Sequence, residues 1–478
     1  MNPPTSLPPL ENFGGNLSLT PRSRYAPATE AELLDILERH RGEEIRAVGR
    51  LHSWSPVLEA EGVLLDLRAF DDVVVHADAQ PPWAEVGAGC QMKRLLAELR
   101  RRGFTSMSQG LIVQQAVAGA AATGTHGSGR HSLSHYVQGV RVARYDAGGQ
   151  PIIETIDSGA ALQAARCALG CLGIVTRVHV AIRPVYRIEE HFRHHATLES
   201  VLEAENRYDL QQFYFIPWRW DFYGQHRLET ERPRSLTAPL YRLYWSIGMD
   251  VLLHWIVIAL ARWLPRWVTK FFFRRILGML VPQGWKVVDW STEQLSMEHQ
   301  LFRHIETELF VTRDRLPQAL AHVELSLRHA SGEKVSLDAA TRERLGTDLL
   351  PQWEKLQGCY MHHYPICIRR VLADDALLSM SSGGERYAIS LISYARPQDR
   401  DGFRRVAEWL ARSLMRLADA RPHWGKHCPL GPEELGSLYP GMAEFRKIAR
   451  GRDPEGRFTN RWLKPLLVSP RNGDASGP

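Results

Sequence analysis

Apolar positions in the first 190 residues change between helical and strand spacing. Thr29 and Glu32 form a capping box, and the leucines and isoleucine that follow predict a helix starting at Thr29. Strand-like runs cover 45–48, 62–67, 73–76 and 83–86, and a second predicted helix carries Met92, Leu95, Leu96 and Leu99. Strands that alternate with single helices predict small βαβ units rather than one long doubly wound sheet.

From about residue 190 to 440, aromatic-rich strands mix with helices. Strands are predicted at 212–220, 360–371 and 387–394, and an apolar face from Phe403 to Leu417 predicts a helix. A chain of 478 residues corresponds to two or three domains of about 150 residues each. We expect a first domain at 10–187, a second at 188–440, and a C-terminal segment at 441–478 that returns to the first domain.

The segment 240–281 has a pattern of its own. Its longest uncharged stretch, Val251–Ala261, is shorter than the ~20 residues that span a bilayer. A basic residue recurs at every fourth position and forms a stripe: Arg262, Arg266, Lys270 and Arg274. Bulky apolar residues lie beside this stripe: Trp263, Leu264, Trp267, Phe271 and Phe272. The pattern indicates either a helix lying in a membrane interface, or an amphipathic pair that covers the second domain or forms an oligomer contact.

Composition excludes a disordered chain, because 44% of the residues are hydrophobic and 23% are charged. A net charge of +6 does not indicate nucleic acid, but it suits an anionic ligand or membrane surface. Six cysteines without a paired framework are expected to be reduced, and no signal peptide is visible. We therefore expect a cytoplasmic protein, with a peripheral position on the membrane as an open alternative.

Three elements rich in glycine and small residues lie in the first domain, at 47–55, 114–129 and 169–176. Such residues let the backbone approach a phosphate closely and direct N–H groups at it. No Walker sequence and no GxGxxG between a strand and a helix are present. Together the three elements predict a phosphate-bearing cofactor.

These elements resemble those of the FAD-linked oxidases of the vanillyl-alcohol oxidase type, in the branch of sugar-1,4-lactone and alditol oxidases. The sequence Gly49-Arg50-Leu51-His52-Ser53 resembles the branch's G-x-G-H-S loop, with Leu51 in place of the second glycine. The stretches 118–129 and 169–176 resemble its other two loops. Near the end, 423–426 matches an H-W-G-K motif and 453–460 a D-P-x-G-x-F-x-N motif.

The resemblance implies an α+β fold, with a two-part α/β FAD-binding domain of the PCMH type and a cap domain whose antiparallel sheet is flanked by helices. It implies FAD as cofactor and oxidation of a CH–OH group by hydride transfer to flavin N5. The positions that match the family's FAD-binding loops are Val48, Gly49, Arg50, Leu51, His52, Ser53, Gly119, Thr123, Gly124, Thr125, His126, Gly127, Gly173 and Val175.

Three residues carry further roles in the resemblance. His52 is expected to bind the flavin covalently, since a neutral imidazole is a competent nucleophile; alternatively it only forms hydrogen bonds. Lys426 is expected near flavin N1, where a cation stabilises the reduced flavin. His423 is a further catalytic candidate, although a histidine beside tryptophan also suits a protein core.

One position departs from the family pattern. A Glu-x-Arg pair that binds the sugar substrate stands here as Cys367-Ile368-Arg369. Arg369 and Cys367 are one strand period apart, so they share a face, but a thiol holds a hydroxyl more weakly than a carboxylate does. Arg369 is expected to orient the substrate oxygen, the general base has no candidate, and a larger or more lipophilic substrate is favoured over a small polyol.

Two alternative functions remain open: an FAD-dependent dehydrogenase or reductase acting on a lipid-linked sugar or sterol, and an electron-transfer flavoprotein module. The expected partners are a small-molecule or lipid-linked sugar-like substrate, molecular oxygen or another electron acceptor, and a peripheral membrane surface through 240–281. No nucleic acid and no metal site are expected, because His191, His194, His195 and the pair His362–His363 have no matching ligand set.

Overall fold

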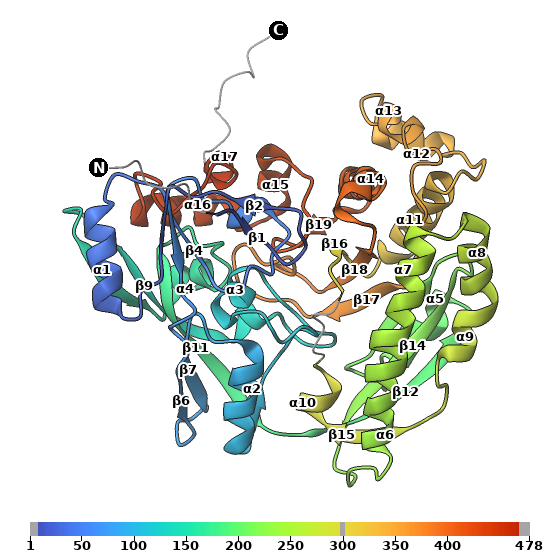
Figure 1. The fold of residues 1–478 in the computed structure, drawn as a ribbon, viewed down its shortest axis with the longest axis horizontal. Coiled ribbons are helices and arrows are strands. Elements are labelled where there is room, and N and C mark those ends of the chain that lie inside the picture. The colour runs from blue at the N-terminus through green and yellow to red at the C-terminus, as the bar shows by residue number, and fades with distance from the viewer. Residues whose placement is uncertain (1–7, 297–301, 468–478) are drawn as a thin grey trace.

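The structure is a computed structural model that describes residues 8–296 and 302–467. Its FAD-binding side contains a parallel sheet in the order β3-β5-β4 and an antiparallel sheet in the order β10-β9-β11-β7-β6, with β8 paired to β11 (Figure 1). The strands are β1 (Leu10–Glu11), β2 (Ser18–Leu19), β3 (Ser23–Tyr25), β4 (Ile45–Val48), β5 (Val63–Asp66), β6 (Val73–His76), β7 (Trp83–Gly87), β8 (Phe104–Ser106), β9 (Val137–Tyr145), β10 (Pro151–Ile156) and β11 (Ile174–Pro184). The βαβ expectation fits the first sheet, whereas the strands of the second sheet are antiparallel.

The cap is one eight-stranded antiparallel sheet in the order β15-β12-β14-β13-β17-β18-β16-β19. Its strands are β12 (Arg187–His195), β13 (Gln212–Ile216), β14 (Asp221–Thr230), β15 (Val287–Trp290), β16 (Ile305–Val311), β17 (Ile366–Val371), β18 (Arg386–Ser393) and β19 (Arg421–Pro422). This arrangement confirms the expected fold class of an FAD-binding domain with an antiparallel-sheet cap.

Helices cover both parts. They are α1 (Glu30–Arg39), α2 (Met92–Arg101), α3 (Val117–Ala122), α4 (Gly159–Arg166), α5 (Leu198–Ala204), α6 (Ala238–Leu243), α7 (His254–Arg262), α8 (Arg266–Phe271), α9 (Leu277–Leu280), α10 (Ser291–Gln294), α11 (Leu316–Ala330), α12 (Ala339–Leu345), α13 (Leu350–Glu354), α14 (Asp401–Ala418), α15 (Pro432–Leu438), α16 (Met442–Arg452) and α17 (Leu463–Leu467). The capping box forms as the sequence predicts, because Thr29 Oγ1 accepts the Glu32 N–H at 3.2 Å and the Glu32 carboxylate accepts the Ala28 N–H at 2.8 Å.

Two predicted strands are shorter in the structure. The strand expected at 212–220 ends at Ile216, because Trp218 and Trp220 have φ angles of 69° and 61° and form the tight turn into β14. The strand expected at 360–371 begins at Ile366, directly after Pro365, which has no N–H to donate to a neighbouring strand. The strand propensity of the aromatic residues made both predicted strands too long, because it does not take the backbone conformation into account.

Residues near the end of the described chain lie against the FAD-binding loops. The buried Arg46 guanidinium donates to the carbonyls of Val57, Leu169 and Phe458 at 2.9, 2.8 and 2.5 Å. The Asn460 amide donates to the Pro56 carbonyl at 2.8 Å. These contacts bring Phe458 and Asn460 against the FAD-binding loops, and the division of the chain into 10–187, 188–440 and 441–478 stays a prediction.

The insert, defined as residues 240–281, packs on the face of the cap sheet that carries Tyr214, Ile216 and Tyr223. Figure 1 shows it on the cap side of the molecule. Together α6, π-helical turns at Tyr244–Leu253 and α7 make one helix, Ala238–Arg262, whose most apolar 18 residues have a mean hydropathy of 1.7. Its 25 residues are long enough and apolar enough to cross a membrane, although no uncharged stretch in the sequence reaches that length. The side formed by Leu253, His254 and Val257 is nevertheless buried against the protein.

Candidate active site

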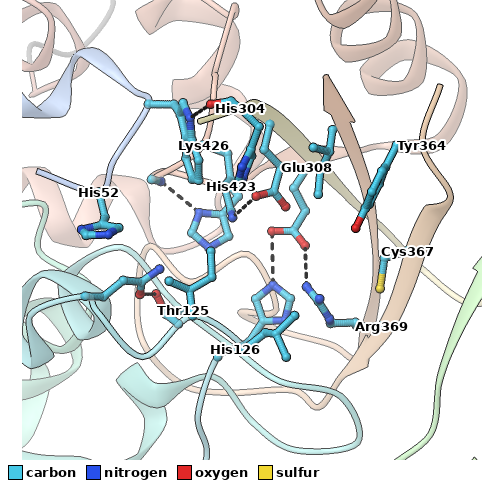
Figure 2. Close-up of a pocket in the computed structure, with 18 of the residues that line it drawn as sticks. His52, Thr125, His126, His304, Glu308, Tyr364, Cys367, Arg369, His423 and Lys426 are labelled. Carbon is cyan, nitrogen blue, oxygen red and sulfur yellow. Dashed lines mark hydrogen bonds and ion pairs between the residues drawn. The ribbon is translucent and has the colours of Figure 1, made fainter. Parts of the chain in front are cut away.

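One continuous cavity of ≈ 280 Å³ lies between the FAD-binding loops, the cap sheet and the insert (Figure 2). Twelve of the residues proposed from the sequence line it, from the first two glycine-rich elements, β17 and the H-W-G-K turn: Gly49, Arg50, Leu51, His52, Ser53, Gly119, Thr123, Thr125, His126, Arg369, His423 and Lys426. Segments that are 372 residues apart in the chain, at Ser53 and Gly425, therefore meet at one site.

Five proposed FAD-binding residues lie outside this cavity: Val48, Gly124, Gly127, Gly173 and Val175. Gly173 has a φ of 129°, and a Cβ there would lie 2.7 Å from the Ala143 carbonyl oxygen. A Cβ on Gly124 would lie 2.7 Å from the Met380 Cε atom. These two glycines are required by the backbone and its packing, and a role for the five residues in FAD binding stays a prediction.

The loop that carries His52 keeps its shape although it has lost a glycine. Leu51 has a φ of 55°, a conformation that glycine adopts more easily. Its side chain packs on the small apolar cluster that contains Leu19 and Val48, and its carbonyl accepts the Phe13 N–H at 2.8 Å. Burial of the leucine side chain offsets the cost of the left-handed backbone.

His52 presents an imidazole nitrogen that the protein itself does not use. Its Nδ1–H donates to the Arg50 carbonyl at 2.8 Å, and its ring stacks on Phe13 at 5.1 Å. The Nε2 atom is buried and has no hydrogen-bond partner within the described part of the chain. Burial, with the positive charges of Arg50 and Lys426, lowers the pKa of His52 and keeps the ring neutral.

These loops fit FAD. A Cβ on Gly49 would lie 2.5 Å from the Cβ of Ala116, so only glycine lets the first loop approach the second this closely. Gly119 lines the cavity with no atom within 4 Å of where its Cβ would be, which leaves room for a flat ligand. His52 lines the same cavity.

Lys426 joins the two parts of the molecule at this cavity. Its ammonium donates to the Glu306 carboxylate and lies 4.6 Å from the centre of the Trp54 ring. In the same turn, the Gly425 carbonyl accepts the Trp54 N–H at 2.9 Å and the Ser53 hydroxyl at 3.0 Å. The H-W-G-K turn thus packs directly on the loop that carries His52.

A buried carboxylate, Glu308 on β16, lies at the centre of the polar cluster. His126 Nε2 is 3.4 Å from one of its oxygens, and Arg369 Nη1 is 3.8 Å from the other (Figure 2). Burial alone would raise the pKa of Glu308, but His126, by charge and hydrogen bond, and the charge of Lys426 hold it below its usual range. Arg369 is fixed in turn by donating to the Gln212 side chain at 3.0 Å.

Sequence reasoning missed Glu308 because no motif contains it. One signal was available: Glu306 and Glu308 alternate on a strand whose seven residues are all buried. Buried carboxylates need partners, so two on one face of an apolar strand indicate an internal polar site.

His423 stays neutral beside this cluster. Its Nδ1 accepts the Gly425 N–H at 2.9 Å, so Nε2 carries the proton, and burial lowers its pKa to about 3. His126, Glu308 and His423 offer three ligand atoms within 4.8 Å of one another. The positive charges of Arg369 and Lys426 beside them oppose a divalent cation, and the absence of a metal site stays a prediction.

Cys367 and Arg369 both line the cavity from β17, as their spacing predicts. Burial raises the pKa of the Cys367 thiol, so it is protonated and uncharged. The cap wall beside Arg369 therefore lacks the carboxylate of the family's Glu-x-Arg pair.

Away from the polar cluster, the cavity is lined by aromatic and aliphatic side chains. Tyr214 is the neighbour of Cys367 across the sheet, Phe192 stacks on Tyr214 at 6.4 Å, and Trp245 of the insert stacks on Phe192 at 4.9 Å. Further apolar lining residues are Ile216, Leu253, Leu277, Val281 and Ile392. No sequence motif marks these positions, because their side chains are ordinary and only the fold brings them together.

Comparison with known proteins gives two family matches. The D-arabinono-1,4-lactone oxidase model matches residues 178–466, and an FAD binding domain model matches residues 21–150. Together they cover most of the chain and both sides of the cavity.

Individual relatives match over nearly the full length. The chain is 50% identical to a long-chain alcohol oxidase from an uncultured marine euryarchaeote, with 96% of each protein covered. It is 24% identical to L-gulonolactone oxidase from Bos taurus, covering 96% of this chain and 98% of that protein. It is 25% identical to alditol oxidase from a Streptomyces species, and the match covers 96% of this chain and 99% of that protein.

The fold is also similar to that of a solvent-stable cholesterol oxidase, with a TM-score of 0.73, 14% identity, and 96% and 97% of the two chains covered.

Proposed function

This chain belongs to the D-arabinono-1,4-lactone oxidase family and is an FAD-dependent oxidoreductase acting on CH–OH groups, and we propose that its substrate is a long-chain primary alcohol. One observation carries the proposal: the polar cluster at Glu308 and Arg369 continues into a cavity lined by Tyr214, Phe192 and Trp245. A hydroxyl would bind at the polar end, and an alkyl chain would bury its methylenes along the apolar end.

Two further observations support an alcohol over a polyol or sugar lactone. Cys367 stands where the family's carboxylate would hold a second substrate hydroxyl, and a polyol hydroxyl left without a partner in this apolar wall is costly. The 50% identical relative is named a long-chain alcohol oxidase.

The residues of the polar cluster have separate tasks. Bound FAD, held by the loops of His52 and Gly119, supplies the acceptor for the hydride that leaves the carbinol carbon. Arg369 donates a hydrogen bond that orients the alcohol oxygen. The ionised Glu308 carboxylate, beside His126 and Arg369, accepts the hydroxyl proton as the hydride leaves, so the alcohol leaves as the aldehyde. The positive charge of Lys426 would stabilise the negative charge that the cofactor gains.

We also propose that molecular oxygen is the final electron acceptor and that His52 binds the flavin covalently. Its neutral ring and unpartnered Nε2 support the covalent bond. Flavin that stays with the protein after acid precipitation, and is released by acid from the His52→Ala variant, is the expected result. Acid-soluble FAD from the wild type would refute the bond.

A lipophilic substrate agrees with a protein that works at a membrane surface. We propose a cytoplasmic location with peripheral membrane contact through the insert, supported by its exposed aromatic side chains. A lipid-linked sugar or sterol remains the competing substrate class.

An anaerobic reduction series tests the proposed substrate. Butanol, hexanol, octanol and decanol would be compared with xylitol, L-gulono-1,4-lactone and cholesterol, following loss of the oxidised flavin's visible absorbance. Each buried methylene contributes about 0.8 kcal/mol, so kcat/KM should rise about fourfold per methylene until the tail fills the cavity. Faster reduction by xylitol, the lactone or cholesterol than by decanol would reject the proposal.

A further inference from the structure

Exposed large apolar side chains are concentrated on the insert and its flanks. Of the twelve such side chains among the described residues, eleven lie between Leu236 and Met279, and the twelfth is Val74 on β6. Trp263 and Trp267 are 64% and 69% exposed on either side of the turn between α7 and α8. Exposed apolar side chains gathered on one segment in this way are typical of an interaction site.

Positive charge accompanies this apolar surface. Residues 236–281 contain six basic residues and one acidic residue, Asp250. Arg262, Arg266 and Arg274 donate to backbone carbonyls of neighbouring segments, and within the described ranges no carboxylate forms an ion pair with them or with the exposed Arg275. Their charges are therefore not neutralised by the protein.

The opposite side of the same helices lines the substrate cavity. Trp245, Leu253 and His254 of the long helix, and Leu277 and Val281 after it, contact the cavity. Figure 1 shows α8 and α9 at the edge of the cap farthest from the FAD-binding domain, with α7 on their inner side. The insert is thus the part of the chain that separates the apolar end of the cavity from the exterior.

We propose that the insert docks flat on the surface of an anionic bilayer and that the alcohol passes from the bilayer between the insert helices into the cavity. Tryptophan beside lysine and arginine suits the interfacial layer of a membrane, where apolar rings are buried and cations meet lipid phosphates. The docking stands on the exposed surface alone, and the access route rests on the proposed function.

A bilayer fits this surface better than a second copy of the chain. A two-fold dimer would bring the charges of Arg262, Arg266, Arg274 and Arg275, which the protein does not neutralise, against their own copies. The helix Ala238–Arg262 lies along the surface rather than across the membrane, because its Leu253, His254 and Val257 side is occupied by the protein.

Flotation of the holoenzyme with vesicles tests the docking. Vesicles of phosphatidylcholine with one third phosphatidylglycerol should bind the protein, with affinity that falls at high salt, and pure phosphatidylcholine should bind it more weakly. Trp263→Ala and Trp267→Ala should each weaken binding about tenfold, and Arg275→Glu at least about fivefold. Val74→Asn and Lys447→Glu change an exposed apolar and an exposed basic residue on the FAD-binding side and should bind as the wild type.

Rates with vesicle-dissolved and water-dissolved alcohols distinguish a defect in membrane docking from a defect in the reaction itself. The Trp263→Ala/Trp267→Ala variant should oxidise vesicle-dissolved dodecanol at least about tenfold more slowly than the wild type and dissolved butanol at the same rate. Equal dodecanol rates would overturn the access route. Absence of wild-type vesicle binding, or a dimer in light scattering that the double variant abolishes, would overturn the docking. Failure of the wild type with both alcohols would reject the proposed function without touching the flotation result.

Discussion

The two ends of the cavity are built by opposite means. At the flavin end, charged and polar side chains from distant segments fix one another: Lys426 with Glu306, His126 with Glu308, and Glu308 with Arg369. At the insert end, the lining is aromatic and aliphatic, and the contacts between Tyr214, Phe192 and Trp245 are ring stacking without charge.

The difference means that the two ends have different tasks: the flavin end carries out the reaction, and the insert end selects the substrate. Each charge at the flavin end has one geometry in which its partners are satisfied, so a single substitution there leaves a buried group unpaired. The apolar end depends on shape and area, so a substitution there changes which substrate fits while the reacting groups stay in place. Substitutions at each end should therefore have effects of different kind and size.

The largest effect is expected for Glu308→Gln. Removing the group that accepts the hydroxyl proton should lower the rate of anaerobic flavin reduction by about a hundredfold or more for every alcohol, regardless of chain length. Glu385→Gln, at a carboxylate 36% exposed outside the cavity, should reduce flavin at the wild-type rate. A Glu308→Gln rate within threefold of the wild type would assign the proton to another group.

A smaller loss is expected for Lys426→Met, which keeps the length of the side chain and removes its charge. Flavin reduction should slow by more than about tenfold, because the cation beside the cofactor is gone. Lys447→Met on α16, an exposed lysine, serves as the control. Because the Gly425 carbonyl rather than the lysine holds Ser53 and Trp54, the flavin content of the Lys426→Met variant should match the wild type.

Cys367→Glu should add a carboxylate, which is typical of the flavin end, to the apolar wall of the cavity. A carboxylate beside Arg369 can hold a second hydroxyl, so weak oxidation of xylitol should appear while kcat/KM for decanol falls about tenfold. Cys367→Ser, which adds no charge, should leave xylitol unreactive. Vigorous xylitol oxidation by the wild type would show that Glu308 already supplies the missing acid for polyols.

The smallest and most selective effect is expected for Trp245→Ala. Removing the indole lengthens the cavity, so the kcat/KM ratio of hexadecanol to decanol should rise about threefold to tenfold. Trp255→Ala changes a tryptophan of the same long helix that is 55% exposed and lies outside the cavity, and with detergent-dissolved alcohols and no vesicles it should leave this ratio unchanged. An unchanged ratio for Trp245→Ala would mean that the tail ends before reaching the insert.

The sequence predicted the flavin end better than the insert end. The glycine loops and the H-W-G-K turn are local patterns shared with the family, so the resemblance could assign Gly49, His52, Gly119 and Lys426 to one site, and all four line the cavity. Local capping chemistry likewise predicted the helix that begins after Thr29. Glu308 was not predicted as a site residue, because its role depends on His126 and Arg369, which lie beside it only in the folded protein.

The apolar end could not be predicted for the same reason. Phe192, Tyr214 and Trp245 belong to two strands and the insert, and a tryptophan in an amphipathic segment has the same sequence signature whether it packs in a core or lines a cavity. The turn at Trp218 was also missed, because strand propensity depends on the residue type and does not show that Trp218 has a positive φ.

Arg46 links the FAD-binding loops to the order in which the chain is made. Its guanidinium is held by the carbonyls of Val57, Leu169 and Phe458, and Phe458 leaves the ribosome after the whole cap. Until then this buried cation lacks one of its three acceptors. We therefore expect the packing of the part that is synthesised first to be completed last, and FAD to be bound stably only after Phe458 has been made.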